Sequence, residues 1–276
     1  MNQTADLTEK TLSREEKYQG SFLSLHVDQV QLPNGRTSFR EVVEHVDGVA
    51  ILALDDRNNV LTVTQYRYVI GKTLLEIPAG KLEPGEDPVA GALRELKEET
   101  GLSDIYMEQL FTFGDVDRDP RMRVISVAYM ALVSKDKLHP VAGDDAANVK
   151  WFTIKTQEDD SLILLAKGVT LTEESIAFDH EKVIKTALQR LRNKVEYTDI
   201  TFELAGEKFT LTQLQSIYEA ILGRKLHKSN FRRGIVDRLE KTEEKETKSS
   251  NRPACMYRKK DIGKAKQRGD QVWVRC

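Results

Sequence analysis

The sequence predicts an α/β protein in two parts, a larger acidic domain followed by a small basic domain with a helix-turn-helix. Three observations predict this. Strand-like segments recur through the first domain, a helix with marked ends interrupts them, and the charge changes sign along the chain. Residues 196–276 contain 18 Lys and Arg against 12 Asp and Glu, whereas residues 1–195 contain 24 against 32. We therefore expect domains at 1–195 and 196–276 with different partners.

Length and composition are those of a globular protein. The chain has 276 residues, of which 39% are hydrophobic, and a formal net charge of −2. No apolar run approaches the roughly 20 residues of a membrane helix, and the polar N-terminus is unlike a signal peptide, so we expect no membrane partner. Cys255 and Cys276 provide neither a disulfide framework nor a zinc cluster, which favours a cytoplasmic location.

Segments with the composition of strands precede and follow residue 80. The continuous apolar run Val49–Leu54 predicts a strand buried on both faces. The helical spacing of Ile184, Leu188 and Leu191 predicts a helix that closes the first domain. The expected strands, separated by turn signals, are Phe22–Gln31, Ser38–His45, Gly48–Leu54, Val60–Tyr66, Leu74–Ile77, Glu108–Phe113, Val124–Val133 and Val149–Phe152.

A helix is expected at residues 88–100, because both of its ends are marked. Asp87 is a natural N-cap, Pro88 suits the first helical position, and Gly101 suits the C-terminal stop. A strand end and a turn with Pro78 and Gly80 precede it. The unit is therefore a strand, a glycine-containing loop, an acidic helix and a glycine stop.

The two faces of this helix differ in character. One face carries the apolar residues Val89, Leu93 and Leu96, and the other, with Gly91, carries Glu95, Glu98 and Glu99. Like charges crowded beside a glycine do not stabilise a helix, but they suit a hard divalent cation, which prefers oxygen ligands. The alternative is an ordinary solvated acidic face with an Arg94–Glu98 pair.

The segment resembles a complete Nudix box. The positions that carry the resemblance, each at the spacing of the motif, are Gly80, Glu86, Arg94-Glu95-Leu96, Glu98-Glu99 and Gly101-Leu102. The resemblance implies an α/β/α sandwich with a mixed sheet. It also implies Mg²⁺- or Mn²⁺-dependent hydrolysis of a nucleoside diphosphate linked to another moiety.

Roles for individual residues also follow from the resemblance. Glu95 and Glu99 would be the principal metal ligands, with Glu98 beside them and the Ala79 carbonyl as a further oxygen. Glu98 and Glu99 are therefore the first catalytic candidates. Gly80 and Gly101 are structural parts of the motif, as are Glu86 and Arg94, which would form an ion pair that holds the loop against the helix.

Residues 16–100 resemble bacterial ADP-ribose pyrophosphatases beyond the box. Arg40, Glu41 and Arg67 match positions that contact the nucleotide and its phosphates in that group. A guanidinium suits a phosphate because it donates two parallel hydrogen bonds; exposed strand charges are the alternative. That group dimerises through its N-terminal strands, so Phe22–Val43 is expected to join a homodimer.

The chain departs from that group after the box. The usual Ser-Pro-Gly turn and the later glutamate are missing, and residues 113–121 resemble instead the Nudix domain of NrtR-type regulators of NAD metabolism. Arg118 and Arg121 are candidate anion contacts, or else ordinary polar loop residues. Asp144 and Asp145 are the first candidates for the missing base, ahead of residues 158–160. The absent glutamate leaves the rate of catalysis open.

The sequence of the second domain predicts a helix-turn-helix. Thr212 and Gln215 form a capping box for an amphipathic helix that Gly223 ends, and Ser229 caps a second, basic helix. The second helix of such a motif meets DNA. The candidate contacts are Lys225, Lys228, Asn230, Arg232 and Arg233. A basic accessory helix that packs on a partner subunit is the alternative.

The same region resembles the winged-helix half of NrtR-type regulators, through Phe209–Arg233 and Arg252–Arg258. The resemblance places Arg252 in a DNA-binding wing. Residues 240–251, rich in Lys, Glu, Thr and Ser, are expected to be a mobile wing tip.

Three functions are compatible with these residues. The first is hydrolysis of ADP-ribose to AMP and ribose 5-phosphate. The second is transcriptional regulation, in which the Nudix domain senses ADP-ribose and the second domain binds double-stranded DNA. The third is a Nudix enzyme whose C-terminal part only mediates assembly. Three aligned carboxylates favour hydrolysis as the primary activity, and the basic domain favours regulation as the alternative.

Overall fold

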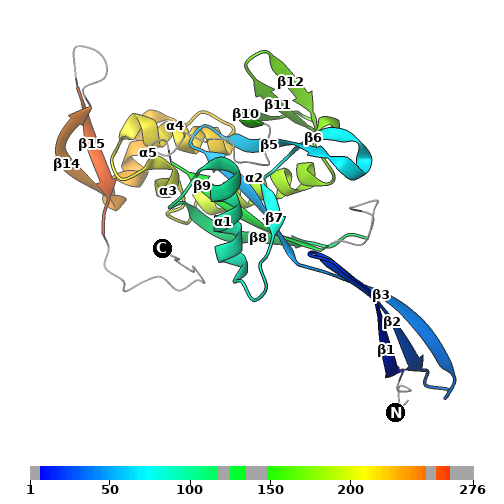
Figure 1. Cartoon of the computed structure of the whole chain (residues 1–276). Helices are drawn as coiled ribbons and strands as arrows, with labels where there is room; N and C mark the ends of the chain where they lie inside the picture. Colours follow the sequence, from blue (N-terminus) through cyan, green and yellow to red (C-terminus); the bar gives the residue numbers. More distant parts are fainter. Residues whose placement is uncertain (1–6, 117, 119–124, 135–147, 247–252, 262–276) are drawn as a thin grey trace. The chain divides into compact units, whose positions relative to one another are not determined.

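The computed structural model describes residues 7–116, 118, 125–134, 148–246 and 253–261 (Figure 1). The chain divides into two units. The first comprises residues 1–47 with 81–86, and the second comprises residues 48–80 with 87–276. Within the described residues, no helix is both long and apolar enough to span a bilayer.

The first unit contains an antiparallel sheet with the order β1-β2-β3, formed by Lys10–Gln19, Leu23–Gln31 and Thr37–His45. Along β2, every second side chain from His26 to Val30 is buried. Asp28 lies among them and accepts hydrogen bonds of 2.8 and 2.9 Å from Arg14, which satisfies its buried carboxylate. The sequence pattern does not predict β1, because its ten residues are all exposed and mostly charged or polar.

A mixed sheet of nine strands forms the body of the second unit. Its main path is β12-β11-β10-β5-β4-β9-β8, with β6 paired to β5 and β7 paired to β4. β4 runs parallel to β9 and antiparallel to β5. The strands are β4 (Gly48–Asp55), β5 (Asn59–Arg67), β6 (Lys72–Glu76), β7 (Ala79–Lys81), β8 (Tyr106–Phe113), β9 (Ser126–Val133), β10 (Asn148–Thr156), β11 (Leu162–Ala166) and β12 (Val169–Thr172).

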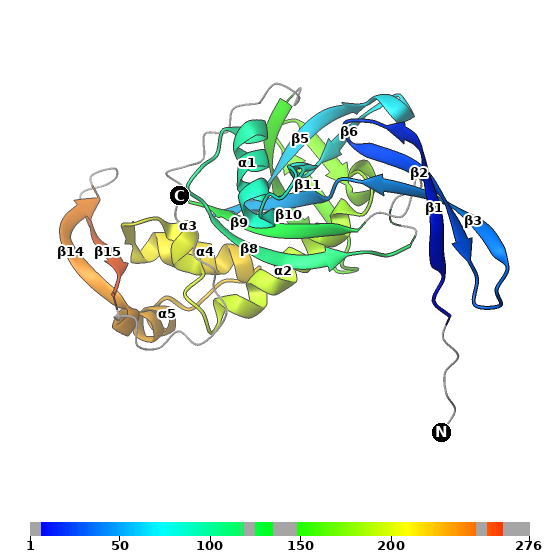
Figure 2. The same ribbon diagram turned by 60° about the horizontal axis from the view of Figure 1, so that its bottom comes forward.

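Two helices, α1 (Pro88–Thr100) and α2 (His180–Val195), lie on opposite faces of this sheet (Figure 2). β4 is buried along almost its whole length, as its continuous apolar run predicts. Leu52 and Leu54 belong to the core cluster that includes the inner face of α2. Ile51 and Ala53 are fully buried and point to the other face, because strand side chains alternate. The expected α/β/α arrangement is confirmed.

The start of α2 is fastened to the segment that leads into β7. The N–H of Ile77 donates to Nδ1 of His180 at 3.4 Å, and the N–H of Ala177 donates to the carbonyl of Leu75 at 3.0 Å. A ring nitrogen accepts a hydrogen bond only in the neutral imidazole. Burial lowers the pKa of His180 to about 4, so the neutral form is retained at physiological pH. The sequence pattern does not single out His180.

The last described elements form a winged helix. Two helices separated by a tight turn pack on a three-stranded sheet with the order β13-β15-β14. The elements are α3 (Thr201–Ala205), β13 (Phe209–Thr210), α4 (Leu211–Leu222), α5 (Lys228–Ile235), β14 (Leu239–Glu246) and β15 (Ala254–Lys259). The strand expected in the wing is present as β15.

One hydrophobic core joins the winged helix to the nine-stranded sheet. Leu188 of α2 and Leu214 of α4 belong to the same buried cluster as Leu52 and Leu54 of β4. At the end of α4, Nε of Arg192 donates to the carbonyl of Ile221 at 3.2 Å. The core is therefore continuous across residue 195, and the domain division into 1–195 and 196–276 stays a prediction.

Some local details differ from the sequence predictions. The capping box of α4 is Thr210 with Gln213, not Thr212 with Gln215, because the backbone is extended at Thr210 and turns helical at the next residue. His227 rather than Ser229 precedes α5, and its side chain makes no cap. Of the expected mobile tip at residues 240–251, residues 240–246 belong instead to β14, which pairs with β15, and residues 247–251 lie outside the described residues.

The buried His180 predicts a pH dependence of stability. Its folded pKa of about 4 lies below the unfolded value of about 6.5, so the unfolded chain binds the proton more readily. Its contribution is therefore fully present above about pH 6.5 and is lost as the pH falls towards 4, by up to about 3 kcal/mol. Denaturant unfolding at several pH values measures this.

A matched variant isolates the histidine. In His180→Asn an amide oxygen replaces Nδ1 as acceptor and does not titrate. We expect the variant to lose less stability than the natural protein between pH 7 and pH 4.5. Equal losses in both proteins would contradict this assignment.

Candidate functional site

The acidic helix α1 has the predicted caps at both ends. The side chain of Asp87 accepts hydrogen bonds from the N–H groups of Val89 and Ala90, at 3.0 and 3.1 Å. Gly101 adopts the left-handed conformation with φ of 72°, and its N–H donates to the carbonyl of Lys97. Because both ends are held, the position of each side chain along the helix is fixed.

The buried face of α1 differs from the predicted stripe. Leu96 is fully buried as expected, but Val89 and Leu93 are only partly buried. The residues buried on α1 are Gly91, Ala92, Leu96 and Thr100. Gly91 therefore lies on the buried side, where the small residues at positions 91 and 92 let the helix approach its neighbours closely.

Two of the three carboxylates face the loop before the helix. The carboxyl group of Glu95 occupies the space where a Cβ atom on residue 80 would lie, so a larger residue at this position would displace the Glu95 carboxylate. Glu99, one turn further along α1, accepts a hydrogen bond of 3.3 Å from the N–H of Ala79. Glu95 and Glu99 thus share one face of the helix and meet successive residues of β7.

The environment of this pair is poor in solvent. Burial first, and then the neighbouring carboxylate of Glu95, raise the pKa of Glu99 to about 7. The N–H of Ala79 opposes this shift. The side chain of Glu95 is 14% exposed, against 60% for Glu98. Two desolvated like charges are unfavourable unless positive charge is close.

Arg94 supplies one such charge. Its Nη1 atom lies 2.9 Å from Oε1 of Glu95 and 3.1 Å from Oε2 of Glu98. The carboxylate of Glu86 accepts a hydrogen bond of 2.9 Å from the N–H of Glu83 within the preceding loop. The Glu86–Arg94 ion pair expected from the sequence stays a prediction.

The donor atoms suit a hard divalent cation in kind. They are carboxylate oxygens of Glu95, Glu98 and Glu99, near backbone oxygens of the Ala79–Gly80 segment, and such cations prefer oxygen. Within the described ranges, no three His, Cys, Asp or Glu side chains already stand in the geometry of a metal cluster. The guanidinium of Arg94 instead contacts two of the carboxylates. The oxygen donors therefore fit a hard divalent cation, and a cation beside Glu99 would stabilise the crowded carboxylates.

Two arginines proposed to contact anions have carboxylate partners in this structure. Arg67 forms a two-point hydrogen-bonded pair with Glu76, whose side chain is 2% exposed. The side chain of Arg118 is 8% exposed and donates to both carboxylate oxygens of Asp179, at 2.9 and 2.7 Å, and to the hydroxyl of Ser126. A largely buried carboxylate is stabilised by such a partner, which gives Arg118 a structural contact, and its role as an anion contact stays a prediction.

The remaining candidates lie elsewhere in the chain. Arg40 and Glu41 are exposed on β3 in the first unit, where Arg40 pairs with Glu9. The residues proposed from the sequence that lie outside the described residues are Arg121, Asp144, Asp145 and Arg252.

The turn between α4 and α5 is organised by a residue that the sequence analysis did not single out. Glu219 accepts hydrogen bonds from Nζ of Lys225 at 2.7 Å, the N–H of Leu226 at 3.1 Å and the side chain of Gln215 at 2.9 Å. The same contacts, led by Lys225, lower the pKa of Glu219 to about 2. Gly223 begins the turn in the left-handed conformation. The turn is therefore fixed by partly buried and charge-assisted hydrogen bonds.

The helix α5 after this turn is strongly basic. The exposed side chains on it include Lys228, Asn230, Arg232 and Arg233. A phosphate backbone attracts such a surface. Lys225 is 91% exposed but is paired with Glu219. Its charge is therefore partly neutralised and less available to a phosphate.

Comparison with known families identifies three segments. Residues 9–43 match the nucleoside diphosphate sugar hydrolase N-terminal domain, residues 44–164 match the Nudix domain, and residues 201–258 match the NrtR DNA-binding winged helix domain. These matches run in the same order as the first sheet, the nine-stranded sheet and the winged helix.

Individual relatives agree with this order. The chain is 45% identical to the ADP-ribose pyrophosphatase of Bacillus subtilis over 39% of its own length, and it spans 58% of that protein. It is 32% identical to an ADPR responsive transcriptional repressor of Acinetobacter baylyi, over 76% of this chain and 79% of the repressor.

A solved structure extends the similarity to the whole arrangement. NrtR of Shewanella oneidensis, solved in complex with a 27mer DNA, is 29% identical, with a TM-score of 0.62 over 78% of this chain and 93% of that chain. The chain therefore belongs to the Nudix family, as a member that carries an NrtR-type winged-helix domain after its Nudix domain.

Proposed function

We propose that the protein is a divalent-metal-dependent Nudix hydrolase that cleaves ADP-ribose to AMP and ribose 5-phosphate. The observation that carries this proposal is the pair of desolvated carboxylates, Glu95 and Glu99, held against the glycine-containing loop. Similarity to an ADP-ribose pyrophosphatase over the same part of the chain supports the substrate. In this reaction water adds to one phosphorus atom and the bridging P–O bond breaks.

We propose Mg²⁺ or Mn²⁺ as the cofactor. Glu95 and Glu99 would hold it, with Glu98 and the carbonyl of Ala79 completing the oxygen donors. When bound, such an ion neutralises charge on the diphosphate and polarises its phosphorus–oxygen bonds. Oxygen donors of this kind are the ones that Mg²⁺ prefers.

The chain's own residues then prepare the site. The N–H of Ala79 fixes Oε2 of Glu99, and Arg94 restrains the carboxylates of Glu95 and Glu98. The proton released by the attacking water passes to a carboxylate base, which we assign to Asp144 or Asp145. The proposed substrate contacts are Arg40, Glu41, Arg67, Arg118 and Arg121. For Arg67 and Arg118 this requires release from Glu76 and Asp179.

Replacing one carboxylate tests the hydrolase. In Glu99→Gln the charge is lost while the shape and the acceptor for Ala79 remain, so Mg²⁺-dependent release of AMP from ADP-ribose should fall by about 100-fold or more. The measurement is chromatographic quantification of AMP. Glu207→Gln, an exposed carboxylate in the winged helix, is the control. Undiminished turnover by Glu99→Gln would refute the site.

We also propose that the winged helix binds double-stranded DNA and that ADP-ribose in the Nudix domain regulates this binding. The specific observation is the exposed basic surface of α5 beside a fixed turn. The Acinetobacter baylyi relative is a repressor that responds to ADPR, which supports the same linkage here. Hydrolysis would then end the signal. Because such a regulator acts where its DNA and its nucleotide ligand are found, we propose a cytoplasmic location.

Removal of two basic residues tests the DNA interface. The double variant Arg232→Ala, Arg233→Ala should bind a duplex selected from a random library more weakly. The slope of log affinity against log salt should fall by about 2, one unit for each lost phosphate contact. Fluorescence anisotropy at several salt concentrations measures both quantities.

Its control removes equal charge away from the winged helix and the first sheet, as Lys155→Ala with Lys167→Ala, two exposed residues. Unaltered binding by the control is expected. If the natural protein binds no duplex in a salt-dependent manner, the regulatory proposal fails and a role of the basic part in assembly takes its place.

We propose further that two copies associate through the first sheet. By strand pairing, Phe39 and Val43 of β3 share one face with Leu25 and Gln29 of β2, and they are 65% and 51% exposed. Exposed apolar side chains gathered on one sheet face are typical of an interface. The match of residues 9–43 to a nucleoside diphosphate sugar hydrolase N-terminal domain supports the homodimer.

A matched pair of substitutions tests the dimer. Val43→Ser should shift the protein from dimer to monomer in sedimentation velocity, because it places a hydroxyl in the apolar contact. Val236→Ser changes a side chain of nearly equal exposure, 50%, outside this sheet, and should leave the dimer intact. A natural protein that sediments as a monomer would exclude the proposal.

A further inference from the structure

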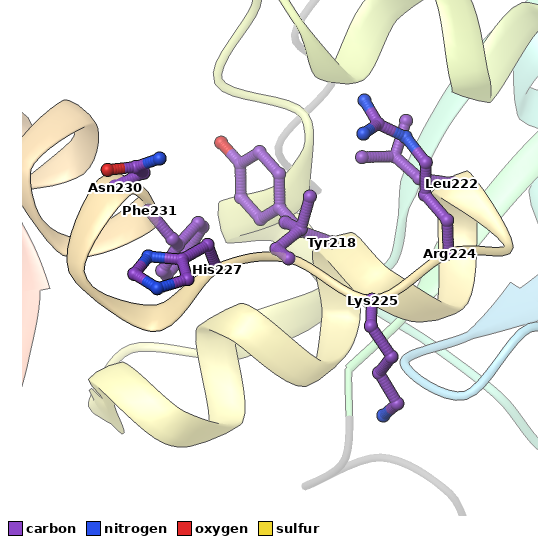
Figure 3. Close-up of a pocket in the computed structure, with 8 residues that line it drawn as sticks. Tyr218, Leu222, Arg224, Lys225, His227, Asn230 and Phe231 are labelled. Atoms are coloured by element: carbon purple, nitrogen blue, oxygen red, sulfur yellow. The ribbon is translucent and has the colours of Figure 1, made fainter.

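An open cavity lies at the surface of the helix-turn-helix, apart from the acidic helix. It has a volume of about 400 Å³ and is formed by the end of α4, the following turn and the start of α5 (Figure 3). Ligand pockets in proteins begin at about 300 Å³. The cavity is therefore large enough for a small molecule.

Its walls are chiefly apolar and aromatic. Tyr218 and Leu222 contribute from α4, Leu226 from the turn and Phe231 from α5. The rings of Tyr218 and Phe231 pack edge to face, with centroids 5.1 Å apart. Such walls favour a flat aromatic guest, because ring pairs gain energy beyond their buried area.

One buried polar group in these walls has no use in the fold. Tyr218 is 9% exposed, yet its hydroxyl makes no hydrogen bond with any described residue. A buried hydroxyl without a partner is costly. Because this oxygen is shielded from water, it lies behind the cavity wall, and the cavity presents the ring of Tyr218 and not its hydroxyl to a guest.

Charge at the rim indicates what the guest carries. In Figure 3 the side chain of Arg224 extends to the same side of the turn as the Tyr218 hydroxyl, whereas Lys225 extends to the opposite side. Lys225 is paired with Glu219. Arg224 is therefore the cation that remains available to an anionic group of the guest.

The cavity is also held in shape before any guest arrives. Glu219 ties Leu226 and Lys225 to α4 through the bonds described above, and the side chain of Gln215 donates to the carbonyl of Leu226 at 3.0 Å. A preformed site loses little conformational entropy on binding.

We propose that this cavity binds a small planar aromatic molecule with one carboxylate or similar anionic group. The ring lies against Tyr218 and Phe231, and the anion meets Arg224. Because α4 and α5 both line the cavity, a bound molecule changes the position of α5 relative to α4. An effect on DNA rests on the proposed DNA binding, whereas binding of the guest does not.

The test uses 1-naphthoate as the probe and its neutral amide, 1-naphthamide, as the comparator. Both are titrated into the full-length, ¹⁵N-labelled protein, and the NMR signals of the Gly223 and Leu226 amides report affinity and location together. Saturable shifts with 1-naphthoate, and weaker binding of 1-naphthamide, are expected. The absence of saturable shifts at these two amides would overturn the proposal.

Two variants separate the contribution of the Arg224 charge to binding from that of the Phe231 ring. Arg224→Gln should weaken 1-naphthoate by about two- to fivefold, while Arg36→Gln, an exposed arginine in the first unit, should leave its affinity unchanged. Phe231→Leu keeps an apolar wall but removes the ring, and it should weaken the acid and the amide alike. Equal affinities of Arg224→Gln and Arg36→Gln would overturn the assignment of the anion.

Discussion

The close approach of α1 to the backbone of β7 is the constraint on which the candidate active site depends. Glu95 occupies the space that a side chain at residue 80 would need, and Glu99 takes its hydrogen bond from the adjacent N–H. Two like charges then stand in a poorly solvated place, where they repel each other, and burial together with the charge of Glu95 raises the pKa of Glu99. That arrangement is unfavourable for folding alone, and it is suited to a positively charged ligand.

The segment that meets α1 is held from behind by paired polar groups. Glu76 ends β6 with Arg67 as its partner, and Ile77 donates to the neutral ring of His180 at the start of α2. Arg118 joins the same region through Asp179. Glu76 and His180 are buried and each has a partner, which is the condition for polar groups inside a core. These contacts therefore hold the backbone of the segment before α1 in place next to Glu95 and Glu99.

Much of this arrangement could be predicted from the sequence, and the exceptions have physical causes. Local signals were sufficient for Asp87, Gly101 and the buried strand β4, because caps and apolar runs act on their own segment. They failed where the exact backbone path and tertiary contacts decide: Val89 and Leu93 of the expected apolar stripe are only partly buried, and Thr210 rather than Thr212 caps α4. His180 and Glu219 act through partners distant in sequence or in a turn, and no short pattern marks such residues.

The shared core of the sheet and the winged helix limits how the two proposed activities can be separated. A chain cut after α2 would uncover the apolar surfaces that α4 now covers, and the excised C-terminal fragment would expose Leu214 and Ile217 to water. The activity of either fragment would therefore not show what the same segment does in the intact protein. Genetic dissection of this protein accordingly calls for single surface replacements, and any deletion phenotype reflects lost folding before lost recognition.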